Sequence, residues 1–247
     1  MEIIVQKFGG SSVANTEMLF KVCKHITKEK DKGKSVVAVV SAQGKTTDNL
    51  IQEEEEITLT PSKDKHDILV SVGEQITIAK LAMCLETLGY DTECYLGWQV
   101  PIITDSNFGD ANIVEIKKNN IMKDLERGKI VIVAGFQGID KNNKITTLGR
   151  GGSDTTAIAL AAELKAQKCE IFTDVDGVYS KDPNKNEHAM KYNQISYDKM
   201  LDMANKGAKV LHNKCVKLAK EKKVKIIVKS TFKEESKGTI VKWINME

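Results

Sequence analysis

Short runs of apolar residues recur along the chain and alternate with longer stretches in which apolar positions return every three or four residues. The clearest run is SVVAVVS at 35–41, which is typical of a central parallel strand buried on both faces. Helical spacing is clearest where Leu19, Val22 and Ile26 fall on one face. Strands that alternate with helices predict an α/β sheet with helices on both sides.

The same patterns predict the remaining elements. We expect further strands at 3–5, 91–97, 129–134, 169–173 and 225–228, a hairpin over 138–147, and a terminal hairpin-like segment. We expect helices over 66–88, 117–127, 196–205 and 207–221, and one from a cap at Ser153 or Asp154 to about Gln167. Gly73 should mark a break or a close approach, and the acidic run 53–56 a solvated helix face or loop.

Together these elements predict a three-layer α/β/α sandwich with a mainly parallel central sheet. No linker composition divides the chain, so we expect one fold with two lobes around a cleft. Ligands of such sheets bind beyond the carboxyl ends of the strands. Those ends are expected at 7–12, 41–47, 136–138 and 173–179, and functional residues should gather there.

Composition and charge exclude several classes of function. A net charge of +3 over 247 residues leaves no basic footprint for nucleic acid. The longest apolar runs are too short to span a bilayer, and the N-terminus opens in a strand pattern rather than a signal peptide. The five cysteines are scattered, which suits a reducing compartment. We therefore expect a cytoplasmic protein with no nucleic-acid or membrane partner.

Arginine is rare in this chain, and one of its two positions is unusual. Lysine and arginine number 37 together, but arginine occurs only at Arg127 and Arg150. Arg150 lies in LGRGGSDTTA at 148–157, a glycine loop that opens a helix. A guanidinium holds a carboxylate or phosphate through two parallel hydrogen bonds, which an ammonium does not. We predict a small anionic substrate bound by Arg150; the alternative is an arginine that merely covers a loop.

A second glycine turn follows the first strand. Lys7, Gly9 and Gly10 lie between a predicted strand and a predicted helix, where amides and a positive charge favour phosphate. The turn is no Walker A loop, and 149–152 is no Rossmann fingerprint. Two such turns, each at a predicted helix start, indicate phosphate handling.

Several carboxylates accompany these turns. They are Asp154, Asp174, Asp176 and Asp182. Next to a polyphosphate they imply Mg²⁺ on the nucleotide, lysines that they hold, or hydrogen bonds to a ribose. The alternative is ordinary turn and cap chemistry. Glu74, after Gly73, could receive an ammonium group or be an ordinary exposed helix glutamate.

Taken together, these features resemble the aspartate kinases of the amino-acid kinase superfamily, over essentially the whole chain and in the same order. The matching stretches are KFGGSSV (7–13), VVSAQGKTTDNL (39–50), VGE (72–74), GFQG (135–138), TTLGRGGSDTTA (146–157), TDVDGVYSKDP (173–183) and GAKVLH (207–212). The resemblance implies the amino-acid kinase fold, with a substrate lobe at roughly 1–145 and a nucleotide lobe at roughly 146–247.

The resemblance also implies roles for individual residues. The ATP-binding set would be Lys7, Gly9, Gly10, Ser11, Thr173, Asp174, Tyr179, Asp182 and Lys209. The aspartate-binding set would be Ser41, Thr47, Glu74, Phe136, Arg150 and Ser153, with Arg150 on the α-carboxylate and Glu74 on the ammonium. Catalysis would fall to Lys7, Asp154 and Lys209, with Mg²⁺ carried on the ATP phosphates.

The implied reaction is phosphorylation of the β-carboxylate of L-aspartate by ATP, the first step toward lysine and related amino acids. The alternatives are another carboxylate or carbamate kinase of the same fold, or an inactive amino-acid- or nucleotide-binding regulator. The chain departs from the family at Asn184, where arginine is common, at Asn213, where proline is usual, and at Ser11, where threonine is common. We expect no regulatory ACT domain in these 247 residues, and a homodimer or an ACT-bearing partner chain both remain open.

Overall fold

The structure is a computed structural model, and it describes residues 1–181, 183, 186–207, 210–233 and 235–244. Two of the predicted nucleotide residues, Asp182 and Lys209, lie outside the described residues, as does Asn184. The other predicted site residues all lie within them.

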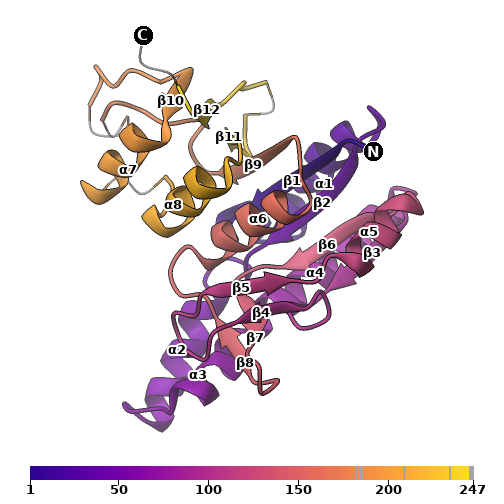
Figure 1. Cartoon of the computed structure of the whole chain (residues 1–247), viewed down its shortest axis with the longest axis vertical. Coiled ribbons are helices and arrows are strands. Elements are labelled where there is room, and N and C mark those ends of the chain that lie inside the picture. The colour runs from indigo at the N-terminus through magenta and orange to yellow at the C-terminus, as the bar shows by residue number, and fades with distance from the viewer. Residues whose placement is uncertain (182, 184–185, 208–209, 234, 245–247) are drawn as a thin grey trace.

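A mainly parallel sheet runs through the molecule (Figure 1). Its strands, in spatial order, are β10 (Gln194–Ser196), β12 (Thr239–Lys242), β11 (Ile226–Ser230), β9 (Lys168–Thr173), β1 (Ile3–Phe8), β2 (Ser35–Val40), β6 (Ile130–Ala134) and β3 (Thr92–Tyr95). β12 pairs antiparallel with β11, which confirms the terminal hairpin-like segment, and the pairs from β11 to β3 are parallel. Every residue of β2 is buried, as its unbroken apolar run predicts.

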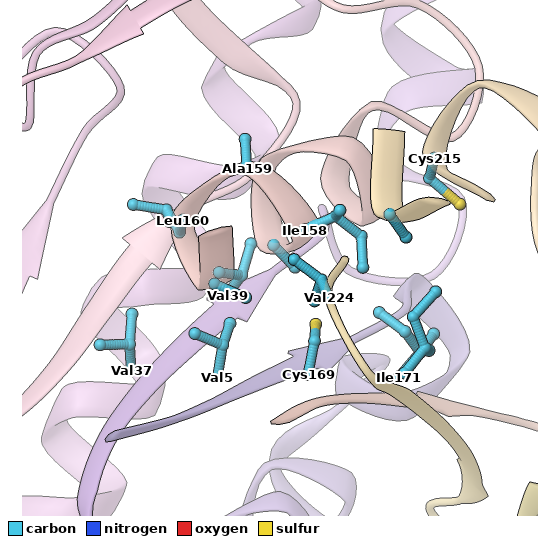
Figure 2. Close-up of a cluster of buried hydrophobic side chains, with 14 of the residues drawn as sticks. Val5, Val37, Val39, Ile158, Ala159, Leu160, Cys169, Ile171, Cys215 and Val224 are labelled. Atoms are coloured by element: carbon cyan, nitrogen blue, oxygen red, sulfur yellow. The ribbon is translucent and has the colours of Figure 1, made fainter. Parts of the chain in front are cut away.

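Helices cover both faces of this sheet, which confirms the three-layer sandwich. Side chains of a strand alternate between faces. Val36, Ala38 and Val40 of β2 therefore pack with α1 (Thr16–Lys30) and α4 (Val72–Thr87). Val37 and Val39 pack on the other face with α6 (Gly152–Glu163) and α8 (Asn213–Lys222). Figure 2 shows this second cluster, in which residues from β1, β2 and β9 lie beneath α6.

A second, smaller sheet lies at the lower end of the molecule in Figure 1. Its order is β5 (Ile113–Ile116), β4 (Ile102–Thr104), β7 (Gln137–Ile139) and β8 (Ile145–Thr147). The antiparallel pair of β7 and β8 confirms the predicted hairpin. We did not predict β4 and β5, because strands of three or four residues carry too few positions to show a period. The helices α2 (Thr46–Ile57) and α3 (Lys63–Val70) lie at the same end of the molecule as this sheet (Figure 1).

The helix predicted over 66–88 is two helices, α3 and α4, which meet at Ser71. Gly73 makes the predicted close approach, since a Cβ built there would lie 2.5 Å from Cβ of Ala42. The stretch from Lys63 to Thr87 is long and apolar enough to cross a membrane by composition. However, 56% of its most apolar window is buried inside the fold, which is what a core helix shows.

Three helix predictions need correction. α6 begins after Gly151, whose φ of +72° makes it the cap, so Ser153 and Asp154 lie in the first turn instead of capping it. The helix predicted from 207 is α8, and it begins at Asn213. By contrast, α7 (Tyr197–Asn205) and α5 (Asn119–Glu126) match their predictions to within a few residues. The run at 53–56 is helical, but Glu54 is buried because its carboxylate pairs with the His66 ring at 2.7 Å.

Candidate active site

A cavity of about 530 Å³ opens where the carboxyl ends of β1 and β2 meet the start of α6. It brings together most of the residues that the sequence predicted. Those residues are Lys7, Gly9, Gly10, Ser41, Thr47, Glu74, Phe136, Arg150, Ser153 and Asp154. They span the chain from Lys7 to Asp154, so the fold alone places them side by side.

Lys7 and Asp154 form the charged floor of this cavity. Period-two alternation puts Ile3, Val5 and Lys7 on the face of β1 that α6 covers. Asp154, in the first turn of α6, meets Lys7 there, with Nζ 2.7 Å from Oδ1. Both side chains are 12% exposed, and this oxygen has the ammonium as its ion partner but no hydrogen bond of good angle. The carboxylate of Asp154 thus holds the ammonium of Lys7 in place beside the two glycine turns.

The first glycine turn packs tightly against the segment that follows β2. A Cβ on Gly10 would lie 3.0 Å from the carbonyl oxygen of Ala42, and the Gly44 amide donates to the Gly10 carbonyl at 3.0 Å. The turn opens a 3₁₀ helix, Gly10–Val13, and α1 starts only at Thr16, so the predicted helix start here is a single tight turn. Ser11 is exposed and does not line the cavity.

Glu74 is buried at 3% exposure, which excludes the reading of it as an ordinary surface glutamate. Its Oε1 accepts a hydrogen bond from the Ala42 amide at 2.9 Å, while its buried Oε2 has no partner among the described residues. Burial raises its pKa to about 7, and the Ala42 amide opposes this shift only in part. A buried, unpaired carboxylate oxygen at a cavity wall is suited to receive a cationic group.

Arg150 lies on a loop whose backbone only glycine can form easily. Gly149 and Gly151 have φ values of +71° and +72°, in the left-handed region. A Cβ on Gly151 would also lie 2.5 Å from Cβ of His212. The Arg150 side chain is exposed and makes no hydrogen bond or ion pair with a described residue. Its guanidinium fork is therefore available to a ligand in the cavity.

Phe136, between β6 and β7, and Ser153, in α6, line the cavity. Phe136 has a φ of +70°, which is strained for a bulky residue and is held by hydrogen bonds from its amide to Thr156 and from the Leu148 amide to its carbonyl. Gly135 lets Ser153 approach, since a Cβ there would lie 2.8 Å from the Ser153 Oγ. Strain of this kind is concentrated at binding sites.

Sequence reasoning missed a buried carboxylate beside the cavity. Asp67 of α3 has no exposed surface, and its Oδ2 accepts from the amides of Gly109 at 3.0 Å and Thr147 at 2.8 Å, while its Oδ1 accepts from the Thr147 hydroxyl at 2.7 Å. It fixes two of the loops that form the cavity wall. Asp48 and His66 also line the cavity and were not predicted. A single sequence gives no signal for them, because polar residues on exposed helices are common.

Three other predicted nucleotide residues, Thr173, Asp174 and Tyr179, lie at the end of β9 or on the segment after it, together with Asp176. The Thr173 hydroxyl donates to Asp174 at 2.9 Å, and the Tyr179 hydroxyl donates to Asp176 at 2.7 Å. Burial disfavours the charged form of Asp176, but hydrogen bonds from Tyr179 and Lys191 outweigh it and lower its pKa. Asp176 therefore has structural partners, while Asp174 is exposed. None of these four side chains lines the cavity described above.

Among the described residues that line the cavity there are charged and polar side chains but no cysteine. The five cysteines are free thiols, four of them buried, and burial raises the pKa of Cys23 to about 12. No group of three His, Cys, Asp or Glu side chains forms a metal cage among the described residues. Mg²⁺ is commonly held by one or two carboxylates together with substrate phosphates. Asp154 could supply such a carboxylate, so the residues present fit Mg²⁺ that arrives on a nucleotide.

Comparisons with known proteins show which proteins this chain resembles in sequence and fold. Aspartokinase of Bacillus sp. strain MGA3 is 51% identical over 241 residues, which are 98% of this chain and 58% of that protein. The aspartate kinase of Synechocystis superposes with a TM-score of 0.88 at 40% identity, covering 99% of this chain and 40% of that one. Aspartokinase III of E. coli, solved with aspartate and ADP, superposes with a TM-score of 0.88 at 27% identity, covering 100% of this chain and 66% of that one.

The chain thus spans 58% of the length of the Bacillus aspartokinase, and the similarity is to that portion of the longer protein. The model of the amino acid kinase family matches residues 2–230, nearly the whole chain. The chain belongs to the amino acid kinase family.

Proposed function

We propose that the protein transfers the γ-phosphoryl group of ATP to the β-carboxylate of L-aspartate. The observation that carries this proposal is Glu74, whose buried Oε2 has no partner in the part of the chain that the structure describes and whose Oε1 is fixed by the Ala42 amide. The same cavity is lined by Arg150, whose guanidinium pairs with no described residue. An α-amino acid has an ammonium group that can pair with Glu74 and a carboxylate that can pair with Arg150.

These two contacts would orient the substrate. With the α-carboxylate on Arg150 and the ammonium on Glu74, the side-chain carboxylate of aspartate is left to face the phosphate-binding turn. Ser41, Thr47, Phe136 and Ser153 line the rest of the cavity and would complete its shape. Positioning of this kind converts two bound substrates into a near-attack pair.

The phosphate end would be formed by Lys7 and the amides of Gly9 and Gly10. Lys7 is held 2.7 Å from Asp154 and brings a positive charge to the point where negative charge develops. ATP would arrive with Mg²⁺, which supplies further charge neutralisation on its phosphates. Thr173, Asp174 and Tyr179, together with Lys209 and Asp182, would contact the rest of the nucleotide.

The chemistry needs no general base, because the attacking carboxylate is ionised at neutral pH. This agrees with a cavity that holds charged and polar groups and no thiol. Residues 1–145 would contribute most of the aspartate contacts and residues 146–247 most of the nucleotide contacts, with Arg150 and Ser153 at the junction. The reaction suits the cytoplasm, where ATP is supplied.

The proposal is tested by ADP release with four acceptors in turn: aspartate, glutamate, acetylglutamate and carbamate. We expect turnover with aspartate and little with the other three. Turnover with another acceptor would reassign the substrate within the same family. No ADP release with any acceptor, from protein that binds ATP, would favour an inactive nucleotide-binding regulator.

A further inference from the structure

Lys214, in the first turn of α8, contacts two loops that are distant from it in sequence. We propose that Lys214 is a positioning residue for aspartate: it holds the backbone of the 148–151 loop so that Arg150 is presented to the cavity. The inference rests on the proposed function, in which Arg150 binds the α-carboxylate.

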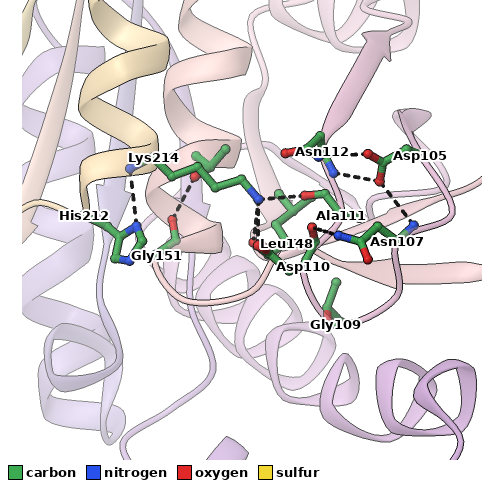
Figure 3. Close-up of polar contacts among 12 residues, drawn as sticks. Asp105, Asn107, Gly109, Asp110, Ala111, Asn112, Leu148, Gly151, His212 and Lys214 are labelled. Atoms are coloured by element: carbon green, nitrogen blue, oxygen red, sulfur yellow. Dashed lines mark hydrogen bonds and ion pairs between the residues drawn. The ribbon is translucent and has the colours of Figure 1, made fainter.

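The ammonium of Lys214 uses all of its donors on these loops. It donates to Oδ1 of Asp110 at 2.8 Å, to the carbonyl of Ala111 at 2.9 Å and to the carbonyl of Leu148 at 3.3 Å (Figure 3). Its side chain is 25% exposed, whereas that of Asp110 is 70% exposed. An exposed ion pair contributes little by itself. The carbonyls of Ala111 and Leu148 are backbone groups, so hydrogen bonds to them fix the backbone of both loops.

The position of the Arg150 guanidinium depends on this backbone. Leu148 immediately precedes Gly149, and Arg150 stands between two glycines in left-handed conformations. Glycine leaves the backbone free to adopt other conformations. The Arg150 side chain has no polar partner among the described residues. Contacts to the backbone of the loop therefore fix the point from which the Arg150 side chain extends.

The start of α8 touches this loop at both ends. Lys214 holds Leu148 at one end, and His212, which precedes α8, packs against Gly151 at the other (Figure 3). The Lys214 amide donates to Nδ1 of His212 at 3.4 Å, which links the two contacts. Asp67 independently anchors the base of the loop through Thr147. Loss of Lys214 should therefore loosen the loop without unfolding the domain.

The test replaces Lys214 by methionine, which keeps the aliphatic stem and removes the donors. Lys217→Met, one turn along α8, is the matched control, because Lys217 is exposed and has no polar partner among the described residues. We expect Lys214→Met to raise the KM for aspartate about tenfold, the scale of a small misplacement of a binding group, with little change in the KM for ATP. Lys214→Arg, which keeps several donors, should recover most of this loss, and Lys217→Met should stay within about twofold of the parent.

A double-mutant cycle separates positioning from general damage. If Lys214 acts through Arg150, then adding Lys214→Met to Arg150→Ala should raise the aspartate KM little further, because the group to be positioned is already gone. Additive effects of the two substitutions would overturn the inference. So would an equal rise in the KM for ATP, or an aspartate KM in Lys214→Met that matches the parent.

The outcome is distinguishable from failure of the proposed function. If the parent protein does not phosphorylate aspartate, the proposed function fails before any variant is compared. If the parent is active and Lys214→Met behaves like Lys217→Met, the positioning role alone is wrong. Lys214→Met, measured in parallel, should still unfold in one cooperative transition well above the assay temperature; a variant that is partly unfolded at the assay temperature would assign Lys214 a structural role and overturn the inference.

Discussion

Nζ of Lys7 lies 2.7 Å from Oδ1 of Asp154, and both side chains are 12% exposed. This ion pair joins the end of β1 to the first turn of α6 and is thus part of the fold as well as of the cavity. A buried pair of this kind holds a lysine in one place, which a flexible surface lysine cannot achieve. The position of Lys7 is therefore coupled to that of the glycine loop that begins α6.

Lys7→Ala should remove activity and also lower stability. We expect turnover to fall about a hundredfold or more, because a positive charge is lost where the transition state gains negative charge. We expect the free energy of unfolding to fall on the order of 3 kcal/mol, because Asp154 is left as an unpaired buried charge. Steady-state kinetics and urea unfolding measure the two effects.

The double variant Lys7→Ala/Asp154→Ala provides the control for this expectation. It should recover part of the stability, since no unpaired charge remains, and none of the activity. Activity in Lys7→Ala within a few-fold of the parent would show that Lys7 only completes a structural ion pair.

Arg150→Lys should raise the KM for aspartate much more than the KM for ATP. A lysine keeps the charge but cannot reproduce the two parallel hydrogen bonds of the guanidinium fork. Arg127→Lys is the matched control, because Arg127 is the other arginine of the chain and lies exposed at the end of α5. A larger change in the KM for ATP would assign Arg150 to the nucleotide.

Glu74→Gln should weaken aspartate binding and leave succinate, which lacks the ammonium group, less affected. The reason is that Oε2 of Glu74 is buried without a partner among the described residues, so the ammonium of aspartate would pair with it. The KM for aspartate and the inhibition constant of succinate against aspartate turnover measure the two effects. Glu55→Gln, an exposed change on α2, serves as control. Equal losses for aspartate and succinate would mean that Glu74 acts only through the Ala42 amide.

The stability of the free protein should depend on pH through Glu74. Burial raises its pKa from 4.5 to about 7, so between these values the folded state binds a proton that the unfolded state has lost. The associated stability is present below pH 4.5 and disappears as pH rises through about 7, a loss of about 3 kcal/mol. Unfolding curves at pH 5 and pH 8 should show this component in the parent and lack it in Glu74→Gln. Equal pH dependence in both proteins would contradict the assignment.

Much of the fold follows from the sequence, because it depends on strong and local patterns. The run at 35–41 is buried along its whole length in β2, and the turn at 141–144 joins β7 to β8 as predicted. β4 and β5 did not follow, since strands of three or four residues carry too few positions to show a period. The cap of α6 was also wrong: Gly151 takes that position through its left-handed backbone, and this leaves Ser153 and Asp154 to line the cavity.

The candidate site was predictable where a residue type is unusual for its surroundings. Arg150 stands out in a lysine-rich chain, and Glu74 stands out beside a glycine in an apolar helix; both line the cavity. Asp67 and the pair of Glu54 and His66 were not predictable, because nothing in the sequence says which surface-type residues the fold will bury. The network of Lys214 needs three separate segments to be in place before it exists.

The central claim is that Arg150 and Glu74 hold the α-carboxylate and the ammonium of aspartate and leave its β-carboxylate to be phosphorylated. The most direct measurement uses aspartate labelled with carbon-13 in the β-carboxylate, together with ATP, Mg²⁺ and hydroxylamine, which traps an acyl phosphate as a hydroxamate. We expect the hydroxamate to form at the labelled carbon, in step with ADP release. A hydroxamate at the α-carboxylate, or ADP release without any hydroxamate, would contradict this account.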